Sequence, residues 1–138
     1  MSSYEEKVIS LLKKGKYKFE REKRFNDLKG GRYRYDFYIH GARPILLEIQ
    51  GEQHYRYIPK FYRTRAEFES AKERDRRKIS YALANQIPLY CIPYWELDNI
   101  AAASQLFDER FCAKNRWKND LDWQKHKKFD KPSKILVQ

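Results

Sequence analysis

The sequence predicts an α/β domain of the α+β type, built from a helix, a three-stranded antiparallel meander, a second helix and a fourth strand. Two stretches, residues 4–14 and 64–85, carry apolar side chains at the three- and four-residue steps of an amphipathic helix. Four shorter runs alternate in polarity or are continuously apolar, as strands are. These runs are residues 17–25, 33–39, 45–51 and 88–92. A length of 138 residues with 41% hydrophobic content is enough for one domain with a core.

The helices have recognisable ends. The first is expected over Tyr4–Lys14, because Ser3 can cap its first turn and Gly15 follows its last residue. The longer helix is expected over Thr64–Asn85, and a further helix over Trp95–Phe107. The inward face of the long helix is predicted to hold Phe68, Ala71, Asp75, Lys78, Ile79 and Ala82, with Leu83 extending it.

Two carboxylates mark the central strands. A tight turn through Gly41–Pro44 would lay these strands side by side and antiparallel, so that Asp36 and Glu48 converge. Glu48 lies in a strongly apolar strand, where an unpaired carboxylate is costly. Two acids at one point repel each other unless a cation lies between them, which favours a hard divalent metal such as magnesium. The alternative is a cross-strand salt bridge or a solvated acid pair.

Three motifs carry a family resemblance. They are Tyr35-Asp36-Phe37, Glu48-Ile-Gln50-Gly51 and Gln53-His54-Tyr55. With them the chain resembles the PD-(D/E)XK nuclease superfamily, and most closely the branch of very short patch repair endonucleases and phage EDxHD homing-type endonucleases. The resemblance covers roughly residues 3–100 and implies a restriction-endonuclease-like core over residues 1–100. Residues 101–138 form a basic, aromatic and partly helical extension that we expect to pack on this core and to contact DNA.

The resemblance assigns the acid pair to a metal centre. Asp36 and Glu48 are the expected ligands, with the backbone carbonyl of Ile49 as a third. The expected cofactor is Mg²⁺, with Mn²⁺ able to substitute, because a hard cation polarises the scissile phosphate and activates a water molecule. With only Cys91 and Cys112 as cysteines and three histidines, a zinc-finger site is not expected.

Further catalytic candidates surround this centre. Gln50 stands where many members of the superfamily have lysine, so it can orient water but supplies no positive charge. Lys78, one helical turn from Asp75 on the long helix, is a source of that charge; the alternative is an ion pair between the two. His54 is a candidate general acid or base, and Glu5 fits the glutamate that approaches the metal from the first helix in the resembled branch.

Charge and aromatic content predict a polyanionic partner. The chain carries 30 lysines and arginines against 19 acidic residues, a net charge of +11, and basic residues alternate with tyrosines in residues 55–63. Such surfaces suit phosphate contacts and base stacking, although a solvated basic surface has the same composition. The expected DNA contacts are Arg34, Arg56, Lys60, Arg63, Arg74, Arg77, Lys125, Lys127 and Lys128.

Taken together, these features predict a Mg²⁺-dependent DNA endonuclease from a phage or bacterium, located in the cytoplasm. A structure-specific nuclease such as a Holliday junction resolvase, and a catalytically inactive DNA-binding module, are the alternatives. Cutting both strands would require a homodimer, whereas nicking would not. No signal sequence or membrane span is expected, because the start is polar and no apolar run is long enough.

Overall fold

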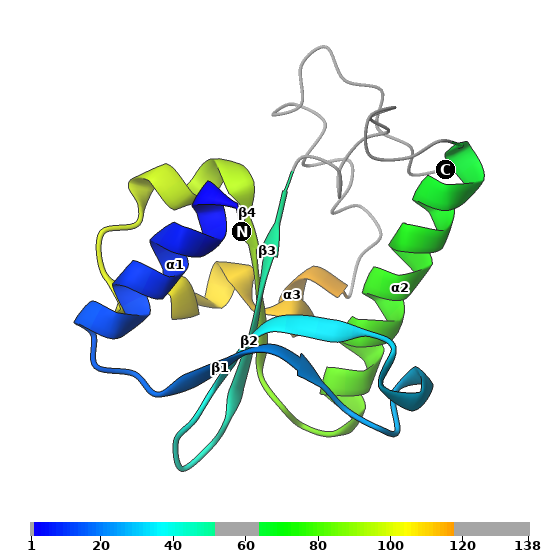
Figure 1. Cartoon of the computed structure of the whole chain (residues 1–138), viewed down its shortest axis with the longest axis horizontal. Coiled ribbons are helices and arrows are strands. Elements are labelled where there is room, and N and C mark those ends of the chain that lie inside the picture. Colours follow the sequence, from blue (N-terminus) through cyan, green and yellow to red (C-terminus); the bar gives the residue numbers. More distant parts are fainter. Residues whose placement is uncertain (1, 52–63, 118–138) are drawn as a thin grey trace.

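The computed structural model describes residues 2–51 and 64–117, which form a four-stranded sheet between two helices (Figure 1). Helix α1 (Ser3–Lys14) lies on one face of the sheet and α2 (Arg65–Ala84) on the other. The strands are β1 (Phe19–Arg24), β2 (Arg34–Ile39), β3 (Ile45–Gln50) and β4 (Leu89–Pro93). The short helices are η1 (Lys29–Gly31), η3 (Tyr94–Asn99), η4 (Ala103–Phe107), η5 (Glu109–Phe111) and α3 (Ala113–Trp117).

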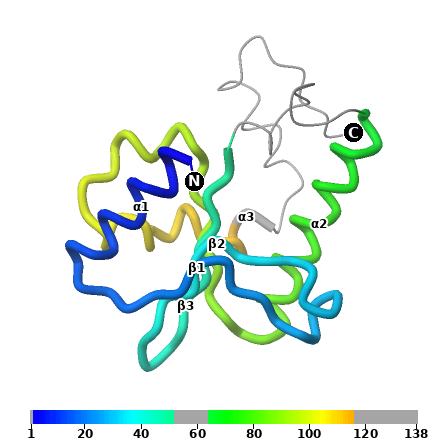
Figure 2. The backbone as a smooth tube through the Cα atoms, in the orientation of Figure 1, coloured from blue at the N-terminus to red at the C-terminus, as the bar shows by residue number. Residues whose placement is uncertain are grey.

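The sheet order is β1-β2-β3-β4. The first three strands pair antiparallel, as the predicted meander requires, and β4 pairs parallel to β3. A parallel neighbour needs a crossover connection, and α2 supplies it. Figure 2 shows β3 rising between the two helices, so that its two faces are covered by different parts of the chain. The predicted mixed α/β class is confirmed at this level.

Two hydrophobic cores flank the sheet. On the α1 face, Leu47 and Ile49 of β3 pack with Val8 and Leu12 of α1. On the α2 face, Leu46 and Tyr35 pack with Ala82 and Leu89. Because β3 is covered on both faces, it reads as a continuous apolar run rather than an alternating one. Residues beyond position 100 belong to both cores. The core on the α1 face includes Ala103, Leu106 and Phe111, and the core on the α2 face includes Ala113.

Side-chain caps fix both long helices. The Thr64 side chain accepts a hydrogen bond from the Glu67 N–H at 3.1 Å, and Asn85 is the C-cap, so α2 matches its predicted bounds to within one residue. Helix α1 begins one residue earlier than predicted, because Ser2 rather than Ser3 is the N-cap and accepts from the Glu5 N–H at 3.2 Å. Leu83 was predicted on the inward face of α2 but is 37% exposed, because it lies about 100° around the helix from the buried Ala82.

The predicted helix over Trp95–Phe107 is wrong. Two short 3₁₀ helices, η3 and η4, occupy this segment, and the backbone at Ile100 and Ala102 between them is extended. The buried side chains follow a step of three residues: Leu97, Ile100, Ala103 and Leu106. A step of three fits the 3.0-residue turn of a 3₁₀ helix better than the 3.6-residue turn of an α-helix.

Several predicted residues lie outside the described ranges. These are His54, Arg56, Lys60, Arg63, Lys125, Lys127 and Lys128. Among the helices of residues 2–51 and 64–117, none combines the length and the apolar character needed to cross a membrane.

Candidate functional site

The central strands lose their regular pairing at Asp36. Backbone pairing of β2 with β3 runs from Ile39 back to Phe37 and ends there. Pairing of β2 with β1 omits the level of Asp36 and Glu22, and Glu22 has a left-handed φ of 53°. Tyr35 and Phe37 are two residues apart, yet they lie in cores on opposite faces. Strand side chains normally return to the same face after two residues, so β2 changes face at Asp36.

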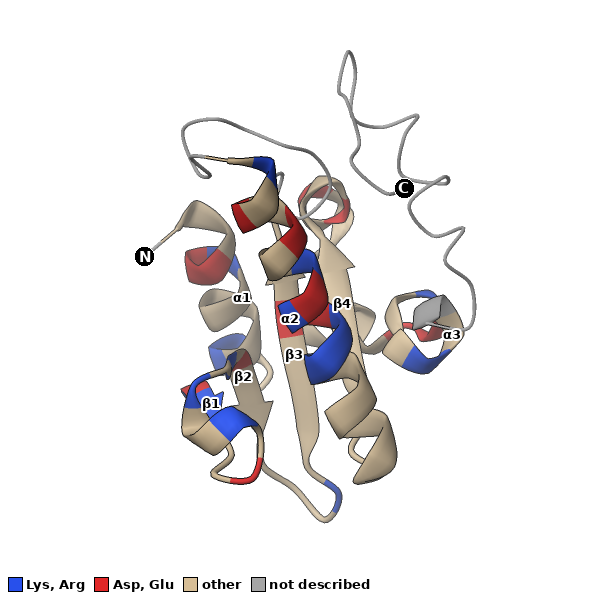
Figure 3. Cartoon of the chain, turned by 90° about the vertical axis from the view of Figure 1, so that its right-hand side faces the viewer, with Lys and Arg blue, Asp and Glu red and all other residues tan. Residues whose placement is uncertain are grey.

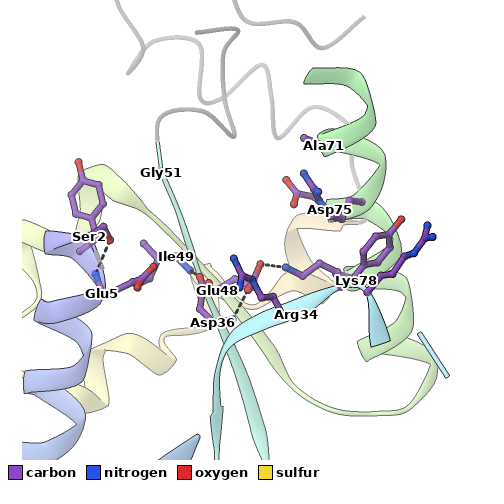
Figure 4. Close-up of a pocket in the computed structure, with 14 residues that line it drawn as sticks. Ser2, Glu5, Arg34, Asp36, Glu48, Ile49, Gly51, Ala71, Asp75 and Lys78 are labelled. Atoms are coloured by element: carbon purple, nitrogen blue, oxygen red, sulfur yellow. Dashed lines mark hydrogen bonds and ion pairs between the residues drawn. The ribbon is translucent and has the colours of Figure 1, made fainter. Parts of the chain in front are cut away.

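The two predicted carboxylates meet in the gap that this irregularity opens. The Asp36 N–H donates to Glu48 Oε2 at 2.7 Å, and the Ile49 N–H donates to Asp36 Oδ2 at 2.8 Å. Each carboxylate thus binds the backbone of the other strand, in place of the missing ladder hydrogen bonds. The convergence expected from the spacing of Asp36 and Glu48 is present, and the close-up view shows both side chains at the centre of the site (Figure 4).

Lys78 reaches the pair from α2. Its Nζ lies 2.5 Å from Glu48 Oε1, and the ammonium and carboxylate side chains are only 10% and 8% exposed (Figure 4). Tyr35 supports this lysine in two ways. The Tyr35 hydroxyl donates to the Lys78 carbonyl at 2.8 Å, and its ring centroid lies 5.2 Å from Nζ. The partner of Lys78 in the structure is therefore Glu48 on the sheet, not Asp75 one turn away.

Burial and neighbouring charges shift the pKa values of Asp36 and Lys78. Burial and the neighbouring Glu48 carboxylate raise the pKa of Asp36 to about 8, although the Ile49 N–H and Lys78 act in the opposite direction. Burial alone would lower the pKa of Lys78, but the Glu48 carboxylate together with Asp75 and Asp36 outweighs it, and the pKa is raised. Near neutral pH, Asp36 therefore holds a proton unless a further cation arrives beside the Glu48–Lys78 ion pair.

A cavity of about 540 Å³ opens over these groups. Its walls come from the start of α1, the start of β2, the end of β3 and the middle of α2. The residues that line it include Tyr4, Glu5, Arg32, Tyr33, Arg34, Asp36, Glu48, Ile49, Arg74, Asp75 and Lys78. Asp36 Oδ1 accepts no hydrogen bond from the described residues, and it is not among their buried unpaired atoms. This oxygen is therefore open to the cavity.

The other predicted site residues fall into two groups. Glu5 lines the cavity, and its Oε1 is held by Arg21 Nη2 at 2.7 Å, whereas the neighbouring Glu6 is exposed and lies off the lining. Asp75 also lines the cavity. Gln50 is 9% exposed and is not among the residues that line this cavity.

The site provides some of the oxygen ligands that a hard cation such as Mg²⁺ requires. Within residues 2–51 and 64–117, no three His, Cys, Asp or Glu side chains form a group that could hold a metal ion. The available ligands are the two carboxylates and the main chain of Ile49, which also lines the cavity. Oxygen ligands of this kind are those that Mg²⁺ accepts, with water completing its coordination.

Sequence reasoning missed Arg21 and Tyr35. Arg21 is a polar residue in a strand of alternating polarity, and only the docking of α1 reveals that it holds Glu5. Tyr35 precedes Asp36, so its motif was recognised, but its contact with Lys78 spans 43 positions of the chain.

Four of the described basic residues line the cavity: Arg32, Arg34, Arg74 and Lys78. Figure 3 marks the lysine and arginine positions along the described chain. Arg34 and Arg74 line it from opposite walls, and exposed Arg34 is paired with Glu22 at 2.6 Å. Arg77 lies outside it, paired with Glu73 at 3.3 Å. Two of the described DNA-contact candidates are therefore next to the acid pair.

Comparison of the chain with protein-family models, with curated proteins and with solved structures gives no match. The function is therefore inferred from the site itself.

Proposed function

We propose that this chain is a metal-dependent DNA endonuclease with the restriction-endonuclease-like core of the PD-(D/E)XK superfamily. The observation that carries the proposal is the meeting of Asp36 and Glu48 beside Lys78 in a solvent-open cavity. Two acids on the central strands can hold a metal ion, and a metal ion and a lysine are groups that stabilise the negative charge of phosphodiester hydrolysis. The resemblance of the sequence to very short patch repair and EDxHD endonucleases points the same way.

Asp36, Glu48 and the Ile49 carbonyl would hold Mg²⁺, or Mn²⁺ in its place. The raised pKa of Asp36 supports this assignment, because a second cation is what would allow that carboxylate to ionise beside Glu48. A bound ion would polarise the scissile phosphate and lower the pKa of the attacking water.

Lys78 would take the role of the lysine that Gln50 replaces. Its ammonium is held at the cavity wall by Glu48 and by the ring of Tyr35, so it is oriented before substrate arrives. From there it would neutralise charge that develops on the phosphate oxygens during in-line attack. The resemblance implies products with 5′-phosphate and 3′-hydroxyl ends.

The basic rim supports DNA as the substrate. The net charge of +11 favours a polyanion, and Arg34 and Arg74 lie where phosphates flanking the reacting one would pass. Contacts of this kind position a nucleic acid without reading its sequence.

Nicking of supercoiled plasmid tests the proposal. Wild-type protein should convert plasmid to the nicked or linear form in Mg²⁺ or Mn²⁺ and not in EDTA. Asp36→Asn and Glu48→Gln should each remove this activity. Glu69→Gln is the matched control, because it makes the same change at an exposed position of α2 outside the cavity, and it should cut like wild type. Cutting that persists in Asp36→Asn would refute the assignment.

One observation favours an inactive DNA-binding module as the second candidate. Both oxygens of Glu48 are already engaged, one by Lys78 and one by the Asp36 N–H. A cation would have to share or displace one of them. Plasmid that stays intact with every divalent metal while the protein still retards it in a gel would establish this second function.

A further inference from the structure

A second cavity, of about 550 Å³, lies outside the candidate site, between α2 and η1. Lys29 of η1 and Arg76 and Arg77 of α2 bring three positive charges to it. The acid on its wall is Glu73, which Arg76 and Arg77 share at 3.3 Å each. We call this cavity the η1–α2 groove.

The backbone that carries Lys29 is strained. Lys29, Gly30 and Gly31 have φ values of 51°, 63° and 82°, three successive left-handed residues. This conformation is unfavourable for a residue with a side chain, and it persists only where the surroundings hold it. Arg24 does so: its Nη1 donates to the carbonyls of Gly31 and Arg32 at 2.7 and 3.0 Å. The turn is thus held from one side, with Lys29 lining the groove.

The charges of the groove are unbalanced. Glu73 can neutralise one of the three cations, and it does so through long contacts with side chains that are 41% and 45% exposed. Like charges gathered in one groove repel each other, and an arriving anion relieves that repulsion. Ser80 also lines the groove and adds a hydroxyl group that can contact phosphate oxygens, whereas the Tyr81 hydroxyl donates to Asp27 Oδ1.

The groove and the candidate site are both lined by α2, through different residues of the helix. Arg74, Asp75 and Lys78 line the first cavity, whereas Glu73, Arg76 and Arg77 line the second. Figure 3 shows lysine or arginine positions on α2 and on the connection between β1 and β2. A strand that leaves the first cavity past Arg74 would therefore meet the groove.

We infer that the η1–α2 groove binds a backbone phosphate of the nucleic acid, away from the phosphate that reacts. This inference rests on the proposed function and deepens it: the substrate is a polymer that reaches from Asp36 around α2 to Lys29. A dinucleotide would fill the first cavity alone. Lys29 and Arg76 are the residues that this site adds to the DNA contacts expected from the sequence.

Salt dependence of binding tests the site. Affinity for a fluorescein-labelled DNA duplex is measured by anisotropy at several salt concentrations, in an Asp36→Asn background that should not cleave. Lys29→Ala and Arg76→Ala should each weaken binding by a similar factor on unrelated sequences. Each should also lower the slope of log K against log salt by about one, the loss expected for one phosphate contact.

Matched controls separate a local contact from net charge. Lys13→Ala and Lys14→Ala remove the same charge from the exposed last turn of α1, away from both cavities, and should leave affinity and slope unchanged. Glu73→Gln should act in the opposite direction and tighten binding, which a merely structural role of Glu73 would not produce. If Lys29→Ala and Arg76→Ala match the lysine controls, or Glu73→Gln weakens binding, the inference is wrong.

Cleavage assays distinguish this inference from the proposed function. With Asp36 intact, Lys29→Ala should raise KM for long DNA and leave kcat unchanged, and it should not affect hydrolysis of a dinucleotide. If cleavage depends on Asp36 but the Lys29 and Arg76 variants bind DNA like the lysine controls, the phosphate site in the groove is refuted and the nuclease proposal stands. Wild-type protein that cleaves no DNA would refute the nuclease proposal. The phosphate site would still stand if the Lys29 and Arg76 variants lowered the slope of log K against log salt as expected.

Discussion

Removing the ammonium of Lys78 is the sharpest test of how the candidate site is built. In Lys78→Met, a side chain of similar length replaces the lysine, but Glu48 keeps its carboxylate on a side chain that is 8% exposed in the native protein. Glu48 then retains the hydrogen bond from the Asp36 N–H and loses its ion pair. The change therefore leaves a buried negative charge without its cation.

The expected loss of stability follows from this burial. Breaking a buried ion pair by removing one partner costs about 3–5 kcal/mol. The cavity above the pair gives water some access to Glu48, so we expect the lower end, about 3 kcal/mol. Since the free energy of unfolding of a small domain is about 5–15 kcal/mol, this loss is a large share of the total stability. Arg77→Met on the exposed face of the same helix loses only a surface pair with Glu73 and should cost less than about 0.5 kcal/mol.

A double-mutant cycle isolates the pair itself. Glu48→Gln keeps an acceptor for the Asp36 N–H but leaves Lys78 without its carboxylate, and should cost about 2 kcal/mol. With both changes no unpaired charge remains from this pair, so the double variant should also lose only about 2 kcal/mol and the coupling should be about 3 kcal/mol. Urea unfolding in EDTA measures all four proteins, with equal m-values as the check on two-state behaviour. Additive losses, or a loss below about 1 kcal/mol in Lys78→Met, would contradict the buried pair.

Three further outcomes follow from the same cluster. In EDTA, the free energy of unfolding should fall as pH rises from about 4 to about 8. Native Asp36, with a pKa of about 8, keeps its proton over this range, whereas in the unfolded chain the same carboxyl group releases the proton above its ordinary pKa of 3.8. Asp36→Asn should reduce this pH dependence, which urea unfolding midpoints near pH 4 and pH 8 would measure. The same pH dependence in Asp36→Asn as in wild type would contradict the raised pKa of Asp36. Mg²⁺ should raise the melting temperature of wild type more at high pH than at low pH, since it competes with the Asp36 proton, and an equal rise in Asp36→Asn by scanning fluorimetry would exclude Asp36 as a ligand. Tyr35→Phe should cost about 1–3 kcal/mol, because the Lys78 carbonyl loses its buried donor, and a cost near zero in urea unfolding would show that this hydrogen bond is absent.

The elements of this fold were predictable where their signals are local. The ends of α2 were predicted within one residue because Thr64 and Asn85 are polar residues at the two ends of an apolar stripe. The two central strands were predicted at 33–39 and 45–51 and are found at Arg34–Ile39 and Ile45–Gln50. The strand-like patterns and the short turn between them were enough to predict that Asp36 and Glu48 lie at the same level of neighbouring strands.

What the sequence did not reveal depends on how distant elements dock. Lys78 was expected to pair with Asp75 or to serve the site, and only the packing of α2 against β3 selects Glu48, 30 positions away. The contact of Arg21 with Glu5 likewise needs α1 to be placed on the sheet. In the segment after β4, an α-helix was predicted over Trp95–Phe107, because over so short a stretch the periods 3.0 and 3.6 are hard to separate.

The break in β2 explains why the acids are held in place before any ligand binds. In a regular ladder, Asp36 and Glu48 would project side by side from one face, with their backbone groups paired to each other. Here the ladder ends at Phe37, and the carboxylates accept the hydrogen bonds that the backbone would otherwise exchange. The side chains therefore lie between the strands, where one cation would reach both carboxylates and the main chain of Ile49. The cost of this arrangement is the raised pKa of Asp36, so the irregularity that orients the two acids also keeps one of them protonated near neutral pH; under the proposed function, a divalent ion would reverse that shift.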